Sequence, residues 1–235
     1  MSNDASGRPP LRLVLPSGDL ARYVRQQIAT VFPDGREPDA RFEDHIQAAL
    51  QRLSLCLAHH ATFDRSRGSR GAGIATFNHL NSDHYAVFLS LLANTVHRGG
   101  GERWIAEKVY CLNKALHAID IYFEVELPAI FMIVHGVGSV VGRATFGDYL
   151  VLYQNCTIGG NTNLEYPVLG RGVVMYAHSR VIGASRIGNN CMIASGALVM
   201  DAVVPDDSVV FGVSPNLEIR PSRHDTVSWY FAAAQ

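Results

Sequence analysis

Residues 169–204 decide the fold, and they read LGRGVVMYAHSRVIGASRIGNNCMIASGALVMDAVV. Within this stretch an aliphatic residue returns at every sixth position, and a small or β-branched residue follows four positions after each one. The aliphatic positions are Leu169, Met175, Val181, Ile187, Ile193 and Val199, and the positions that follow are Val173, Ser179, Ser185, Cys191, Ala197 and Val203. A strict six-residue period is typical of β-helices, in which each hexad forms one flat strand and the aliphatic side chain points into the coil.

The same period extends upstream, and a different pattern precedes it. Val141, Phe146, Leu152 and Ile158 keep nearly the same spacing, with one five-residue step. We therefore predict an α+β chain with a helical domain over 1–118, a parallel β-helix over 119–214 and a short C-terminal tail over 215–235. Apolar residues at helical spacing predict the helices, and Gly, Arg and Ser predict a loop at 65–73. The predicted helices span 18–32, 41–62, 85–96 and 102–117.

Composition excludes several classes of protein. The 235 residues are 48% hydrophobic and 17% charged, with a net charge of -1. These values exclude a largely disordered chain and a basic nucleic-acid-binding protein. No apolar run reaches the ~18 residues that a membrane span requires, and the first residues lack the pattern of a signal peptide. We expect a cytoplasmic protein that binds no metal, with isolated thiols at Cys56, Cys111, Cys156 and Cys191.

Three short segments carry a family resemblance. Residues 134–142 read VHGVGSVVG, residues 154–160 read QNCTIGG, and residues 211–215 read FGVSP. Over about 78–216 the chain resembles the serine acetyltransferases, which are hexapeptide-repeat acyltransferases. The resemblance implies a left-handed β-helix, trimers that sometimes pair through their helical domains, and acetyl-CoA bound between neighbouring β-helices. The implied reaction is acetyl transfer to the hydroxyl of a small acceptor, without a metal.

His135 is the predicted general base, because an unassisted hydroxyl is a weak nucleophile and a neutral imidazole suits the task near pH 7. Asp120 stands fifteen residues earlier, close to one coil, and is the predicted partner that orients the imidazole. An ordinary polar residue after a helix is the competing interpretation of Asp120. Glu124 and Glu126 are rival partners, or groups that bind the acceptor.

The Gly-Gly pair and several coil residues complete the predicted site. The resemblance assigns Gly160 to stabilising the oxyanion through its backbone N–H, although a tight corner would also require glycine. The residues that the resemblance or their charge assigns to binding acetyl-CoA are Gly159, Ala177, His178, Ser195, Arg180 and Arg220.

The chain departs from the family pattern at three places. Val134 replaces the Asp that precedes the catalytic His in serine acetyltransferases. Glu165 and Tyr166 occupy the loop where the family has an Arg-His pair for the carboxylate of serine. The chain ends at 230–235 without the family's terminal Ile, so we do not expect a complex with cysteine synthase.

These departures leave more than one acceptor open. Serine or a related small hydroxylated acceptor is the leading prediction, and a sugar, polysaccharide or secondary-metabolite acceptor is the alternative. A γ-carbonic anhydrase would need three histidines at the metal, whereas the β-helix contains His135 and His178 alone. A non-catalytic scaffold is the remaining alternative, and it would not bind coenzyme A.

Overall fold

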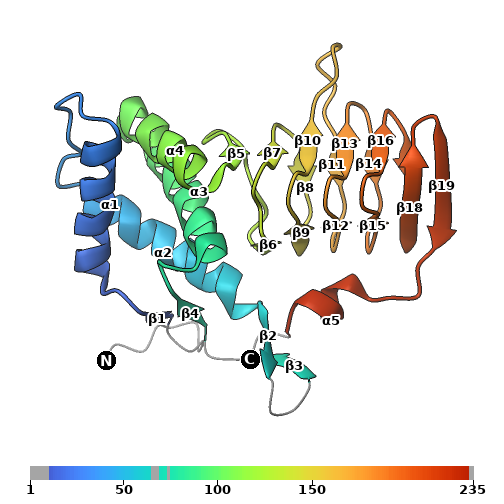
Figure 1. The fold of residues 1–235 in the computed structure, drawn as a ribbon, viewed down its shortest axis with the longest axis horizontal. Helices are drawn as coiled ribbons and strands as arrows, with labels where there is room; N and C mark the ends of the chain where they lie inside the picture. The colour runs from blue at the N-terminus through green and yellow to red at the C-terminus, as the bar shows by residue number, and fades with distance from the viewer. Residues whose placement is uncertain (1–10, 65–68, 73–74, 233–235) are drawn as a thin grey trace.

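The computed structural model describes residues 11–64, 69–72 and 75–232 of the chain. A bundle of helices and a stack of flat coils lie side by side, and a last short helix folds back under the coils (Figure 1). The change from helices to short strands falls at Asp120, close to the predicted boundary.

The helical half contains the four helices predicted from periodicity. Their bounds are α1 (Ser17–Val31), α2 (Phe42–Ala58), α3 (Ser82–Arg98) and α4 (Arg103–His117). The helix predicted over 41–62 ends early, because the backbone from Ala61 enters a hairpin of β2 (Ala61–Asp64) and β3 (Ser69–Ala72). That hairpin also shortens the loop predicted at 65–73. Two short strands, β1 (Arg12–Leu13) and β4 (Thr76–Phe77), pair in parallel beside it.

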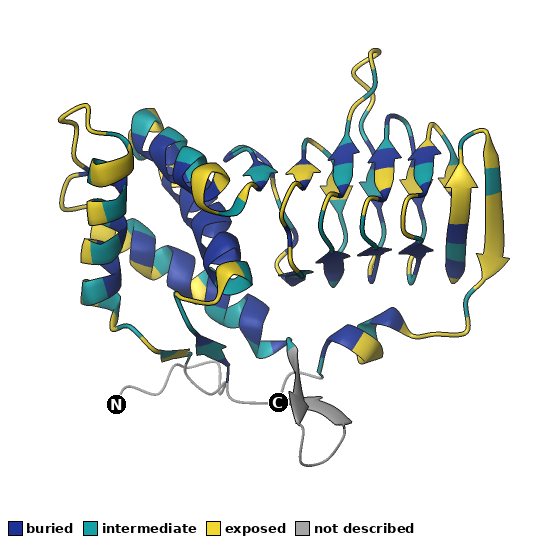
Figure 2. Cartoon of the chain, viewed as in Figure 1, coloured by how far each residue is buried: buried dark blue, intermediate teal, exposed yellow. Residues whose placement is uncertain are grey.

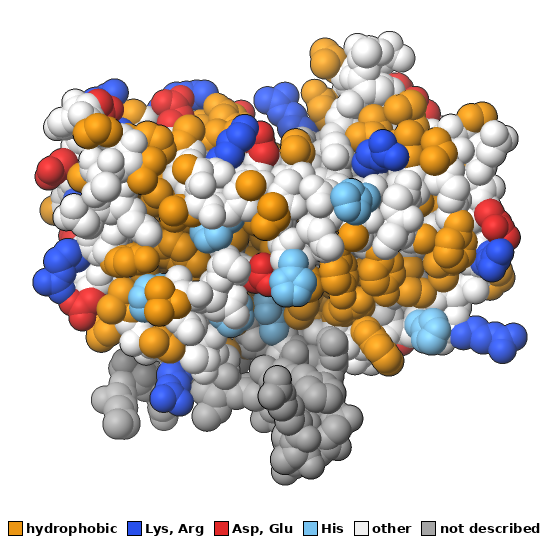
Figure 3. All heavy atoms as spheres, in the orientation of Figure 1, with side chains coloured by type: hydrophobic (Ala, Val, Ile, Leu, Met, Phe, Trp, Pro, Cys, Tyr) orange, Lys and Arg blue, Asp and Glu red, His pale blue; other side chains and the backbone are white. Residues whose placement is uncertain are grey.

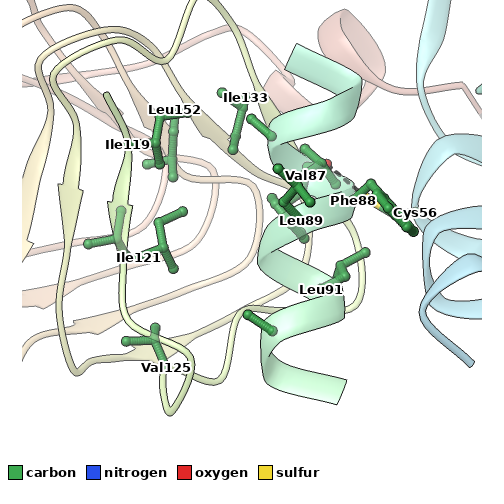
Figure 4. Close-up of a cluster of buried hydrophobic side chains, with 14 of the residues drawn as sticks. Cys56, Val87, Phe88, Leu89, Leu91, Ile119, Ile121, Val125, Ile133 and Leu152 are labelled. Carbon is green, nitrogen blue, oxygen red and sulfur yellow. Dashed lines mark hydrogen bonds between the residues drawn. The ribbon is translucent and has the colours of Figure 1, made fainter. Parts of the chain in front are cut away.

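Helix α3 joins the two halves. Every residue from Tyr85 to Val96 is buried, because α2 and α4 cover part of the helix and the first coil covers the rest. Figure 4 shows Val87, Phe88 and Leu89 on α3 between Cys56 of α2 and the aliphatic side chains of the first coil. The core therefore runs without a break from the bundle into the β-helix.

Each coil after the first contributes one strand to each of three faces, and equivalent strands of successive coils pair in parallel. The first face contains β5 (Asp120–Ile121), β7 (Val140–Val141), β10 (Thr157–Gly159), β13 (Arg180–Ile182) and β16 (Leu198–Met200). The second face contains β6 (Phe131–Ile133), β9 (Leu150–Leu152), β12 (Val174–Met175), β15 (Met192–Ile193) and β18 (Ser208–Val213). The third face contains β8 (Thr145–Phe146), β11 (Val168–Leu169), β14 (Arg186–Ile187) and β17 (Val203–Val204). The first coil, with β5 and β6, has no strand on the third face among the described residues.

The six-residue period corresponds to the ladders of side chains inside the coils, as predicted. Met175 pairs with Leu152 on one side and Ile193 on the other, and all three are buried. Val181 lies in the same way between its neighbours on the first face. Burying one such side chain contributes about 1.5–3 kcal/mol, so the repeated ladder stabilises the stack.

The residue four positions after each aliphatic one is buried in every repeat of this stretch except the last. Val203 is 72% exposed, whereas Val204 is buried and pairs with Ile187. The step from Val199 to Val204 is five residues long, so the residue four positions after Val199 turns outward.

The C-terminal segment returns across the second face. Strand β19 (Asn216–Pro221) pairs antiparallel with β18, and α5 (Thr226–Tyr230) then packs beneath the coils (Figure 2). The hydroxyl of Tyr230 lies 3.1 Å from that of Tyr153 and 3.2 Å from that of Tyr176. Phe231 then forms a bridge to His60, so the end of the chain contacts both halves.

The cysteines are unpaired, and the helices are of ordinary length and hydropathy. All four cysteines are free thiols, as predicted, and burial raises the pKa of Cys56 to about 12 and that of Cys191 to about 11. In the described part of the chain, no helix has the length and hydropathy needed to cross a bilayer.

Candidate active site

A hollow of about 330 Å³ lies at the seam between the two halves. It is bounded by the beginning of α3, the end of α4 and the turn between β6 and β7. Figure 3 shows histidine side chains beside an acidic one at the surface where the helices meet the coils. The lining residues are Ser82, Asp83, Ala115, Leu116, His117, Ala118, Ile119, His135, Gly136 and Val137.

His135 lies on the turn that forms one wall of this hollow. Its backbone has φ 52, the left-handed conformation that non-glycine residues rarely adopt. The side chain is 80% exposed, so a substrate can reach the imidazole. The His135 backbone N–H donates to Asp83 Oδ2 at 3.1 Å, and the Nδ1 atom lies 3.9 Å from the same oxygen.

Asp83 is the carboxylate that the structure brings to His135, and the sequence alone did not identify it. It lies in the first turn of α3, where the side chain of Asn81 accepts from the backbone N–H groups of Asp83 and His84, both at 3.1 Å. The sequence N-S-D at 81–83 indicates a helix cap, which is correct, but it gives no sign of a contact with a residue 52 positions away.

His117, the last residue of α4, is a second histidine on the same hollow. Its Nδ1 atom lies 2.8 Å from Asn113 Oδ1, so the ring donates from Nδ1 and leaves Nε2 as an acceptor. Burial lowers the pKa of His117, which keeps the ring neutral near pH 7. None of the residues that line the hollow in the described chain is Lys or Arg.

Asp120 faces the helices, and it makes no hydrogen bond or ion pair with His135 among the described residues. Tyr110 donates to its carboxylate at 2.7 Å, and the ammonium of Lys114 donates at 2.5 Å. Partial burial would raise the pKa of Asp120, but the hydrogen bonds from Lys114 and Tyr110 outweigh burial and lower it. The role of Asp120 as a partner of the base stays a prediction.

The two rival glutamates are both held by arginines of the helical half. Glu124 lies 3.5 Å from Arg103 and 3.6 Å from Arg143, the latter on the coil side. Glu126 lies 3.4 Å from Arg98. These ion pairs lie at the seam and are partly or largely exposed, and neither glutamate lines the hollow around His135.

The Gly-Gly pair ends β10, where a loop projects from the coils (Figure 1). A Cβ atom on Gly160 would lie 2.9 Å from the ring of Tyr166, whereas one on Gly159 would meet nothing within 4 Å. The side chain of Asn161 holds this loop against the coils, since it donates to the Glu165 carboxylate at 2.8 Å and to the Asp201 carboxylate at 3.0 Å. The ring of Tyr166 thus packs close to Gly160, and the roles predicted for both residues stay predictions.

The predicted coenzyme residues fall into two groups. Ala177, His178 and Ser195 lie at one edge of the coils, where the Gly196 N–H donates to the Ala177 carbonyl at 3.0 Å and His178 has φ 63. Arg180 is exposed on β13 and forms no ion pair within the described ranges.

Arg220 on β19 is already engaged. It pairs with Glu218 at 2.6 Å and lies over the ring of Phe211 at 5.1 Å, so an anion would have to compete with these contacts. A metal site is not formed by the residues that the structure describes, since no three His, Cys, Asp or Glu side chains converge.

Comparison with known proteins gives relatives by both sequence and fold. No protein-family model matches the chain. The serine acetyltransferase of Synechococcus elongatus is 35% identical over 106 residues, which cover 43% of this chain and 43% of that protein. The match therefore spans less than half of the relative's length.

Solved structures extend the likeness to nearly the whole chain. The serine acetyltransferase of Vibrio cholerae superposes with a TM-score of 0.61 and 20% identity, over 91% of this chain and 76% of that one. The Brucella abortus serine acetyltransferase in complex with coenzyme A gives a TM-score of 0.58 and 19% identity, over 87% and 76%. At this identity the superpositions demonstrate a shared fold.

Proposed function

We propose that this chain, a sequence homologue of the serine acetyltransferases with their β-helix fold, is an acetyl-CoA-dependent O-acetyltransferase. The observation that carries the proposal is the position of His135. Its imidazole is exposed at the wall of a hollow large enough for a small acceptor, and its backbone is anchored by a hydrogen bond. It also lies in the segment whose sequence resembles the family's catalytic motif.

The reaction requires one proton to move twice. The neutral imidazole of His135 accepts the proton of the acceptor hydroxyl while that oxygen attacks the thioester carbonyl of acetyl-CoA. The carbon–sulfur bond then breaks, and the imidazolium returns the proton to the departing thiolate. The acetyl ester and free CoA are the products, and no acyl-enzyme forms.

Coenzyme A would lie along the edge of the coils that carries Ala177, His178 and Ser195. Irregular backbone at this edge offers N–H and C=O groups to the amides of the pantetheine arm. Arg180 is the free cation nearest in sequence to this edge, and it would pair with a phosphate. The fold neighbour from Brucella abortus was solved with coenzyme A, which supports coenzyme A as the ligand of this fold.

The acceptor would be a small hydroxylated molecule, serine or a relative of it. Asp83 and His117 offer acceptor atoms to hydroxyl or ammonium groups, whereas the lining residues offer no Lys or Arg to a carboxylate. The charge of the hollow therefore favours acceptors whose carboxylate is absent or masked.

A second copy of the chain would complete the site. Val137 and Val140 beside His135 are 59% and 44% exposed, and an exposed apolar surface next to a site is typical of a subunit contact. We expect a trimer, or two trimers paired through the helical halves. Light scattering after gel filtration should give a mass of three or six chains, and a monomer would contradict the expectation.

An acceptor panel tests the proposed activity. Purified protein with acetyl-CoA should release free CoA when it is given L-serine, homoserine, a serine amide or a hexose, and the carboxylate-free acceptors should react faster. Release of CoA with hexoses alone would indicate that the acceptor is a sugar and not an amino acid. No release with any acceptor, combined with no binding of CoA in calorimetry, would contradict the proposal.

A further inference from the structure

One hydrogen bond crosses from the helical half to the turn that carries His135. The backbone N–H of His135 donates to Asp83 Oδ2 at 3.1 Å. The same oxygen lies 3.9 Å from Nδ1 of the imidazole, so a single carboxylate oxygen faces both the backbone and the ring of this residue. No other Asp or Glu within the described ranges makes a contact of this kind with His135.

The turn needs such a partner. His135 has φ 52, and a non-glycine residue keeps this conformation where its surroundings hold it. Its carbonyl accepts from Val137 at 2.8 Å, and the N–H of Val134 donates to the Leu152 carbonyl at 2.8 Å. The N–H of His135 itself has Asp83 as its acceptor, so Asp83 completes the hydrogen bonding of the turn.

Asp83 is in turn held by a rigid element. The side chain of Asn81 caps the helix and binds the N–H of Asp83 at 3.1 Å. Helix α3 is buried from Tyr85 onward, and the Asp83 side chain is 26% exposed. The carboxylate therefore has a fixed position relative to the first coil.

We propose that Asp83 is a positioning residue for the base His135, supplied by the helical half; this inference rests on the proposed function. The carboxylate attracts the Nδ1–H of the imidazole and leaves the Nε2 lone pair for the acceptor hydroxyl. The 3.9 Å separation is longer than a hydrogen bond, and catalytic contacts of this kind tighten when substrate binds. When Nε2 accepts the hydroxyl proton, the imidazolium forms beside the carboxylate, which stabilises it until the proton passes to the CoA thiolate.

Two other titratable groups near the seam are engaged by other partners in this structure. His117 donates from Nδ1 to Asn113, and its pKa is lowered by burial, so it adds no charge near pH 7. The carboxylate of Asp120 is bound by Tyr110 and Lys114. These contacts leave Asp83 as the anion that faces the imidazole from the helical half.

The substitution Asp83→Asn separates the charge from the backbone contact, because the amide oxygen can still accept the His135 N–H. We expect kcat to fall about tenfold and the KM for acetyl-CoA to stay unchanged. Asp83→Glu keeps the charge and should restore most of kcat, whereas a merely structural role would not distinguish the two variants in this way.

The matched control is Asp44→Asn. Asp44 also lies in the first turn of a helix, α2, and it is exposed and makes no hydrogen bond or ion pair among the described residues. This variant should leave kcat unchanged. A general effect of removing one negative charge would appear in both variants and would contradict a specific role for Asp83.

A second measurement does not depend on turnover. In NMR spectra the imidazole nitrogen signals of His135 should indicate a smaller share of the Nδ1–H tautomer in Asp83→Asn and stay in place in Asp44→Asn. Unchanged signals together with unchanged kcat would overturn the inference. If His135→Ala removes turnover while Asp83→Asn does not, this inference fails alone; if His135→Ala keeps turnover, the proposed base itself is wrong.

Discussion

The regular coils and the first coil have the same type of strand pairing but different surroundings. In the regular coils, from β11 to β15, each strand has an equivalent strand on both sides, and interior residues stack on equivalent residues of the neighbouring coils. In the first coil, one surface packs against α3, and the turn that carries His135 closes over the seam. The repeated coils thus form the scaffold, and the candidate site lies where the first coil packs against the helices.

The largest expected effect tests the regular coils. Met175→Ala removes a fully buried side chain from an inner ladder, and the cavity should lower the free energy of unfolding by about 2–5 kcal/mol. Val203→Ala, at the exposed position where the period fails, should change it by less than ~0.5 kcal/mol. Urea titrations of both variants measure the difference, and equal losses would contradict the inward assignment of the ladder.

The next prediction concerns the seam between the helices and the coils, and it is tested by the pH dependence of the free energy of unfolding. His60 Nε2 lies 2.8 Å from the carbonyl of Phe131, the first residue of β6, and burial lowers the pKa of His60 from 6.5 to about 4. Between these values the unfolded chain binds a proton that the folded chain does not. Stability from this group is therefore complete above pH 6.5 and falls as the pH drops towards 4, by about 1 kcal/mol per unit.

Thermal melts between pH 7 and pH 4.5 measure this slope. His60→Gln should flatten it, because the amide has no proton to bind in this range. His224→Gln, on the exposed C-terminal segment, should keep the slope of the parent protein. If His60→Gln keeps the slope as well, the pH dependence arises elsewhere.

The smallest effect compares two neighbouring glycines at the end of β10. A methyl group on Gly160 would press against the ring of Tyr166 at 2.9 Å, and the ring would have to move. We expect Gly160→Ala to lower kcat about tenfold through the displaced loop, since small displacements at a site are costly. Gly159→Ala has open space around the new methyl group and should change kcat less than twofold. Equal kcat values for the two variants would show that moving the ring of Tyr166 does not affect the reaction.

Most of the scaffold could be predicted from the sequence, because its signals are local. The six-residue period identified Leu169, Met175 and Val181 as interior residues, and helical spacing identified the helices. Two features of the scaffold were not predicted. Val203 is exposed because the spacing of buried residues changes by one there, and the hairpin of β2 and β3 has no clear alternation of apolar and polar residues.

Less of the candidate site could be predicted from the sequence, because its contacts join segments that are far apart along the chain. The spacing of fifteen positions from Asp120 to His135 predicts stacking on adjacent coils, but Asp120 pairs with Val140, twenty positions on. The first coil is longer than the hexapeptide period implies, so its carboxylate turns to the helices. Asp83 reaches His135 through the docking of α3 on the first coil, which no local pattern encodes.

The most direct test of the account measures His135→Ala against the parent protein in two assays. Acetyl-CoA turnover, followed by release of free CoA with the best acceptor of the panel, should fall by ~10² or more, which is the usual contribution of a general base. Binding of CoA, measured by calorimetry on the same preparations, should stay unchanged, because the predicted coenzyme residues lie on other coils. Turnover within a few-fold of the parent protein would contradict the assignment of His135 as the base.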